Sequence, residues 1–159
     1  MKSIRLISLF LVLLVLGCSL IACDTEDWRN VELPERPFYD MTVSFQIKDE
    51  TGRNIIDAPN YNYTGHEEPT ILNIITDYLE IEVDYKYSID EKNKILLSIG
   101  NKKADTSKGQ YWAFMMGVGH DVQAILADSK QQERYFIDGK MSEYLIEDGE
   151  SFTIVLVKT

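Results

Sequence analysis

The sequence predicts an α+β domain in which a mixed β-sheet packs on one short helix. Apolar runs in Tyr135–Thr159 are separated by two glycine turns, at Asp138-Gly139 and at 147–149. One stretch, 69–78, has apolar residues at helical spacing, and several others alternate apolar and polar residues. The closing run Phe152–Val157 is apolar on both faces, which is typical of a strand in the middle of a sheet.

The first 22 residues have the pattern of a secretion signal. Lys2 and Arg5 form a positive start, and the apolar core Leu6–Leu16 is shorter than the roughly 20 residues that a membrane span needs. The segment ends in Leu20-Ile21-Ala22-Cys23, which resembles the lipobox of bacterial lipoproteins. That resemblance implies a diacylglyceryl group on Cys23 and cleavage before it.

Two alternatives exist for this segment. The first is that Val15-Leu16-Gly17-Cys18, a second and poorer lipobox match, is the lipidation site. The second is an ordinary signal peptide, in which neither cysteine has a role. We expect lipidation at Cys23, because leucine is the commoner residue three positions before the cysteine and Cys18 would shorten the apolar core. Two acyl chains suffice for stable anchoring. The expected location is the extracytoplasmic face of a bacterial cell membrane, to which the chain is anchored without spanning it.

Both cysteines lie in the first 23 residues, so the mature domain has neither a disulfide framework nor a catalytic thiol. Removal of residues 1–22 takes Lys2 and Arg5 and no acid, which changes the formal charge from −10 to −12. Such an acidic surface repels phosphate backbones, so we expect no nucleic-acid partner. Residues 23–40 contain two prolines and few apolar residues, which predicts a lipidated cysteine and a tether before a domain at 41–159.

The first half of the domain predicts a hairpin followed by a helix. Met41–Lys48 alternates cleanly and indicates a half-buried strand, and Ile55-Ile56 starts a return strand after a turn. Asn60–Gly65 is polar and aromatic, and we expect a loop there. Glu67-Glu68-Pro69 favours a helix start, because proline suits a first turn and acids complement the helix dipole. A short amphipathic helix over 69–78 follows.

The second half predicts further strands. Leu79–Ile89 alternates with period two, and Ile95–Ile99 follows a turn. After a loop at 100–110, Tyr111–Met116 is apolar on both faces and indicates a covered strand. Gly117–Glu133 fits either a strand or a short helix.

These pieces resemble, in their order, the β-grasp domain found at the C-terminus of transcobalamin and intrinsic factor and in small bacterial surface lipoproteins. The matching segments are Pro69–Leu72, Gly109–Phe114, Ile137–Lys140 and Tyr144–Glu150. The resemblance covers Met41–Lys158 and implies a β-grasp-like fold.

Two departures from the family pattern bear on function. This chain has an insertion at about 117–132 between the tryptophan strand and the next turn, and it contains no helical barrel such as the one against which transcobalamin clamps cobalamin. Binding of cobalamin or another corrinoid is thus implied by the resemblance alone. A corrinoid would be a ligand, and we expect no resident cofactor.

No combination of residues indicates catalysis, so we expect a binding protein and not an enzyme. His66 and His120 stand beside acids but lack a second histidine at ligand spacing, so neither predicts a metal site. The acids of 147–150 bracket a turn glycine and fit turn chemistry.

Tyr111, Trp112 and Phe114 are the candidate ligand-binding residues. Aromatic residues in a covered strand usually serve core packing. The alternative is an apolar platform for a planar small ligand, walled by the loop 100–110 and the insertion. A module that binds a surface protein, through a strand edge or the insertion, is the second functional hypothesis.

Overall fold

The structure is a computed structural model that describes residues 35–138 and 141–158. The described helices and strands all belong to one compact unit, 36–159. The predicted signal peptide, Cys18, Cys23, most of the predicted tether, and Gly139 of the predicted Asp138-Gly139 turn lie outside the described residues. None of the helices in the described ranges is long and apolar enough to cross a membrane.

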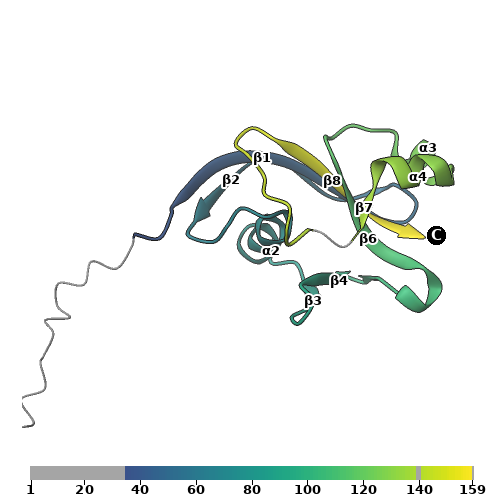
Figure 1. The fold of residues 1–159 in the computed structure, drawn as a ribbon, viewed down its shortest axis with the longest axis horizontal. Helices are drawn as coiled ribbons and strands as arrows, with labels where there is room; N and C mark the ends of the chain where they lie inside the picture. The colour runs from purple at the N-terminus through teal and green to yellow at the C-terminus, as the bar shows by residue number, and fades with distance from the viewer. Residues whose placement is uncertain (1–34, 139–140, 159) are drawn as a thin grey trace, which may run out of the picture. The chain divides into compact units, whose positions relative to one another are not determined.

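A five-stranded mixed sheet forms the centre of the domain (Figure 1). Its strands, in spatial order, are β2 (Asn54–Gly65), β1 (Tyr39–Lys48), β8 (Ser151–Lys158), β6 (Gln110–Met116) and β7 (Ile137–Asp138). β8 runs parallel to β1 and antiparallel to β6, and the remaining pairs are antiparallel. The predicted central position of the closing strand is confirmed.

Helix α2 (Ile71–Ile81) packs on one face of this sheet. Its buried residues include Ile71, Ile74 and Ile75, whose spacing places them on one side of the helix. The predicted helix is confirmed, but it begins after Pro69, because Thr70 is its N-cap. Thr70 Oγ1 accepts a hydrogen bond from the backbone N–H of Asn73 at 3.2 Å. The α+β class, with a mixed sheet on one helix, is also confirmed.

The segment 141–146 closes the N-terminus of α2. The backbone N–H groups of Ile71 and Leu72 donate to the carbonyl oxygens of Tyr144 and Met141, at 3.1 and 3.0 Å. These bonds satisfy donors that a helix start leaves unpaired. Ile146 and Met141 are buried in the same core, so the segment before β8 fixes the position of the helix.

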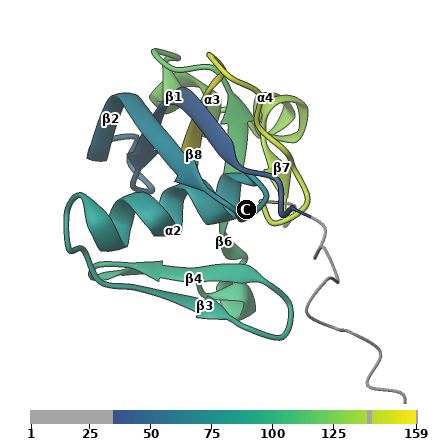
Figure 2. The ribbon, with the colours of Figure 1, turned by 90° about the vertical axis from the view of Figure 1, so that its left-hand side faces the viewer.

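A smaller sheet covers the other side of α2 (Figure 2). It consists of β3 (Tyr87–Asp90), β4 (Ile95–Ile99) and β5 (Lys102–Lys103). Leu96 and Ile99 of β4 are buried in the same cluster as the apolar side of α2. The helix therefore lies between two sheets, and most of its surface is covered.

The prediction of one strand over Leu79–Ile89 is wrong for its first part. α2 continues to Ile81, and the backbone N–H of Tyr85 then donates to the carbonyl of Leu79 at 2.8 Å, with Asp84 at a φ of 45°. Leu79 is the last buried residue of the helical side. The apolar residues that follow in period two, Ile81, Val83 and Tyr85, are consequently left exposed.

Three segments differ from, or complete, the sequence expectations. Asn60–Gly65 is the second half of β2 and not a loop, because its Tyr61 and Tyr63 are buried against the core. The loop 100–110 contains β5 and a short 3-10 helix, Thr106–Lys108. The undecided stretch 117–133 forms two helices, α3 (Val122–Leu126) and α4 (Ser129–Tyr135), which Asp121 and Asp128 cap.

Helix α3 explains why β8 is apolar on both faces. Val122 packs with Ala113, Val155 and Val157 on the face of the large sheet opposite α2. Helix α3 of the segment 117–133 thus contributes to the folded core.

Candidate functional site

The three aromatic candidates of β6 do not share one surface. Trp112 and Phe114 are 3% and 0% exposed and belong to the core between the large sheet and α2. Tyr111 points to the opposite face, where it packs beside the cluster of Ala113 and Val155. This arrangement favours core packing over a joint platform, and ligand contact by these three residues stays a prediction.

Trp112 has one unusual feature. Its indole Nε1 is buried and has no hydrogen-bond partner among the described residues. The side chain lines a narrow crevice with Ile95, Leu96 and Met141, and Lys94 at its edge. The space is too small for a ligand of the size of a corrinoid, so the crevice is not the candidate site.

Each histidine contacts a backbone carbonyl. A ring nitrogen of His66 lies 3.1 Å from the carbonyl oxygen of Pro37, and Phe38 packs edge-on against the ring. His120 Nε2 lies 3.1 Å from the carbonyl oxygen of Met116. The described residues contain no group of three or more His, Cys, Asp or Glu side chains placed to hold a metal ion.

The acids of 147–150 organise a turn, as predicted. Asp148 Oδ1 accepts from the backbone N–H of Thr42 at 2.8 Å, and Glu150 Oε2 accepts from that of Glu147 at 2.8 Å. These bonds attach the turn to β1 and direct the chain into β8. They account for both carboxylates without a catalytic role.

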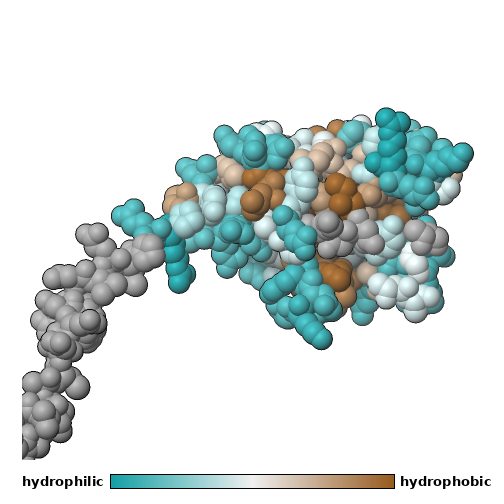
Figure 3. All heavy atoms as spheres, in the orientation of Figure 1, coloured by the Kyte–Doolittle hydropathy of each residue, from teal (hydrophilic) through white to brown (hydrophobic). Residues whose placement is uncertain are grey.

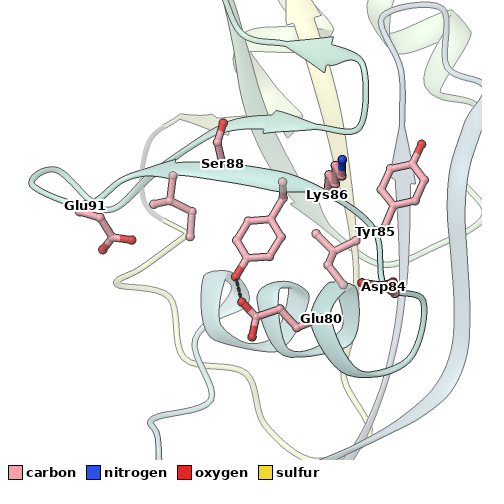
Figure 4. Close-up of a pocket in the computed structure, with 9 residues that line it drawn as sticks. Glu80, Asp84, Tyr85, Lys86, Ser88 and Glu91 are labelled. Atoms are coloured by element: carbon pink, nitrogen blue, oxygen red, sulfur yellow. Dashed lines mark hydrogen bonds between the residues drawn. The ribbon is translucent and has the colours of Figure 1, made fainter.

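The structure reveals a site that the sequence did not indicate, along the solvent side of α2. Two adjacent hollows of about 530 and 440 Å³ lie between α2 and its neighbours. The first separates the second half of α2 from β3, and Figure 4 shows Glu80 reaching from the helix toward that strand. The second separates α2 from the end of β2 and the residues after it, 63–67. Because Glu80 and Tyr87 line both hollows, we treat them as one feature, the α2 groove.

Tyrosine hydroxyls hold two carboxylates of α2. The Tyr87 hydroxyl donates to Glu80 Oε1, the bond dashed in Figure 4, and the Tyr61 hydroxyl donates to Asp77 Oδ2. Burial and the adjacent Glu80 raise the pKa of Tyr87 to about 12, and burial and Asp77 likewise raise the pKa of Tyr61. Both phenols are therefore neutral donors at physiological pH, and they orient the carboxylates without cancelling their charge.

The groove carries a strong excess of negative charge. Five carboxylates line it, against one ammonium group, that of Lys86: Glu67, Asp77, Glu80, Asp84 and Glu91. Within the described ranges, Glu91 is the member of this set that forms an ion pair, with Lys94 at 2.9 Å. By contrast, Asp49, Glu50 and Asp105 elsewhere on the domain each pair with a lysine.

Sequence reasoning missed the groove for one reason. It assigned 79–89 to a single strand, which separated Glu80 and Asp84 from the helix that carries Asp77. Asp77 and Glu80 are three residues apart, which was the available signal that they share a helix side; Asp84 follows the end of the helix.

No family model matches this chain, and no curated protein matches it. Among solved structures, haptocorrin in complex with Cbi is similar, with a TM-score of 0.47 and 12% identity. That match covers 76% of this chain and 25% of the haptocorrin chain, so the present chain spans about a quarter of its length. A candidate metal-binding protein from Ruminococcus gnavus has a TM-score of 0.42 and 13% identity, over 75% of this chain and 98% of that one. Similarity at this level assigns no ligand to the present chain.

Proposed function

We propose that the mature chain is a non-catalytic binding module, held at the outer side of a bacterial membrane by lipid on Cys23, and that its ligand occupies the α2 groove. The observation that carries the proposal is the groove itself. Its two hollows, of about 530 and 440 Å³, form a continuous concave surface that is open to solvent. The Tyr87 hydroxyl and the carboxylates of Asp77 and Glu80 line it and are already fixed by hydrogen bonds, so little ordering is needed on binding.

The membrane anchor is supported by the sequence. Leu20–Cys23 follows an apolar core of signal-peptide length, and residues 23–40 supply a spacer before the first strand. A lipid on Cys23 would hold an acidic domain near a surface that its own charge does not favour.

A corrinoid is the small ligand to test first, because the motif resemblance to the transcobalamin family implies it. The experiment titrates soluble residues 24–159 with cobalamin and follows the visible spectrum and the calorimetric heat. Glu80→Trp places a bulky ring where the two hollows meet, and we expect it to weaken binding at least tenfold. Glu133→Trp is the matched control, because it makes the same change on the exposed side of α4, across the sheet from α2. Equal affinity of the two variants contradicts the proposed site, and no binding at high micromolar cobalamin removes the corrinoid.

A protein-interaction module is the second candidate function. The observation that favours it is the exposed apolar segment beside the groove, where Ile81, Val83 and Tyr85 are 68%, 40% and 38% exposed. Exposed apolar residues gathered at one place often mark interaction surfaces. Deletion of the insertion 117–132 is not a clean test of this candidate, because it removes Val122 from the core. Point substitutions in the exposed segment test it without unfolding the domain.

A further inference from the structure

The α2 groove and the segment that follows it form one surface of mixed character. Glu80 of the groove is followed directly by the exposed Ile81, and Asp84 lies between the exposed Val83 and Tyr85. We propose that this surface docks a protein partner through a segment rich in lysine or arginine, whose neighbouring apolar side chain packs on Ile81 and Val83. The inference deepens the second candidate function, on which it rests, by naming the chemistry of the partner.

The charge of the groove selects a cationic segment. The carboxylates of Asp77 and Glu80 have phenol donors and no ion pair within the described residues, so their charge is available to a ligand. Lys86 is the single ammonium group against five carboxylates in the lining. Complementary charge of this kind accelerates association and discriminates against acidic partners.

The aromatic residues of the groove suit the same chemistry. Tyr85 and Tyr87 line it, and a lysine or arginine cation over a tyrosine face gains further attraction. Tyr85 lies directly over Gly100: a Cβ at that glycine would come within 2.6 Å of the tyrosine hydroxyl oxygen. The absence of a side chain at Gly100 thus allows Tyr85 to lie against the backbone, which limits its motion.

The form of the groove favours a peptide over a small organic cation. Small-molecule sites enclose most of the ligand surface, whereas both hollows here are open to solvent and follow one another along the helix. Figure 4 shows Glu80 on the helix, Asp84 on the connection between the helix and β3, and Glu91 at the far end of β3, so the carboxylates are distributed along the groove. An extended segment with several cations reaches more of them than a compact ligand does. Figure 3 shows one face of the domain, on which hydrophilic residues are interspersed with several separate apolar patches.

The experiment measures binding of fluorescent peptides to soluble residues 24–159 by anisotropy. The probes are a lysine-rich peptide containing leucine, its counterpart with serine for leucine, and a third with glutamate for lysine. The groove variant is Glu80→Gln/Asp84→Asn, in which Tyr87 can still donate to the side chain at 80. Its control is Asp57→Asn/Glu133→Gln, which removes the same charge from exposed positions on the opposite side of the large sheet.

The apolar part of the surface is tested separately. Ile81→Ser removes the most exposed apolar side chain beside the groove, and Leu145→Ser is its control at a residue that is 54% exposed elsewhere on the domain. We expect Ile81→Ser to weaken the leucine peptide about threefold to tenfold and to leave the serine peptide unchanged.

We expect the groove variant to weaken both lysine-rich peptides about fivefold to tenfold, and its charge-matched control to weaken them less than about twofold. The loss should shrink between about 50 and 300 mM salt, because screening acts on exposed charges. Equal losses of affinity in the two double variants indicate general attraction to an acidic protein and overturn the inference. The inference is also overturned if the wild type binds the lysine-rich peptides no more tightly than the glutamate peptide. Cobalamin binding that Glu80→Trp abolishes, without peptide binding, leaves the proposed function standing while this inference fails. If neither cobalamin nor a peptide binds, both fail.

Discussion

The ring of Phe45 is stacked on the ring of Phe152, with centroids 5.2 Å apart and planes inclined by 5°. The two residues face each other across the parallel pair β1–β8, at the first and last long strands of the domain. Both are fully buried, and Tyr78 of α2 packs edge-on against Phe45 at 5.1 Å. This contact joins the two ends of the folded chain to the helix that forms the groove.

Phe152→Ala is therefore expected to lower the free energy of unfolding by about 3–5 kcal/mol. The substitution removes a buried ring and leaves a cavity beneath α2. Urea denaturation followed by circular dichroism measures the effect. Phe38→Ala is the control, because Phe38 is 63% exposed and its loss should change stability by less than about 0.5 kcal/mol. Comparable losses in the two variants would contradict the description of the core.

Asp49 predicts a pH dependence of stability. Burial disfavours its charged form, but hydrogen bonds from Thr51 Oγ1 and from the backbone N–H groups of Thr51 and Arg53, with Lys102, outweigh burial and lower the pKa of Asp49 to about 2. Because the folded-state pKa lies below the ordinary value of 3.8, the stabilisation is present above about pH 4 and is lost as pH falls toward 2.

Asp49→Asn should accordingly cost about 1–2 kcal/mol at neutral pH, and the difference from the wild type should vanish near pH 2. Denaturant titrations across this range measure it. Asp57→Asn is the control, since Asp57 is exposed and receives one weak bond from Gln46 at 3.4 Å. A difference that is constant with pH would show that the carboxylate charge is not what stabilises the turn.

Tyr87 provides a spectroscopic test of the groove. Burial and the bond to Glu80 raise its pKa to about 12, so the ionisation of Tyr87 should be shifted to higher pH than that of an ordinary tyrosine. For this raised pKa, the related stabilisation is complete below about pH 10 and is lost as pH rises toward 12. The difference between alkaline absorbance titrations of the wild type and Tyr87→Phe isolates this group. Glu80→Gln should lower its pKa, and an unchanged curve would mean that the two side chains are not in contact.

Trp112 should behave as a core residue in fluorescence. Trp28→Phe leaves Trp112 as the single tryptophan, and we expect blue-shifted emission with little quenching by iodide. Trp112→Ala should destabilise the domain by about 3–5 kcal/mol, because it empties a site beneath β4. Loss of cobalamin binding in this variant is informative only if the unfolding curve shows that the domain remains folded.

The lipid anchor is tested by two cysteine variants. Cys23→Ser should move the protein from the detergent phase to the aqueous phase on phase separation, whereas Cys18→Ser should not. The expected difference follows from the loss of two acyl chains, each contributing about 0.8 kcal/mol per buried CH₂. The opposite outcome would assign the lipid to Cys18.

Local sequence patterns determined the parts of this domain that depend on one element at a time. Ile71, Ile74 and Ile75 predicted α2 from their spacing, and the two apolar faces of Phe152–Val157 predicted a central strand. Both follow from periodicity, because a helix on a sheet buries one side and a covered strand buries both faces.

The tertiary structure decided which of two competing patterns the chain follows from residue 79 onward. Leu79 belongs both to the helical side and to the alternation that continues to Ile89. Packing of α2 against β4 favours the helix as far as Ile81, and Ile81 and Val83 are then exposed. The groove arises from the same decision, since it requires α2, β3 and the end of β2 to meet. A sequence pattern reports which side of an element is apolar, but not which elements face one another, and for that reason the site became visible only in the folded chain.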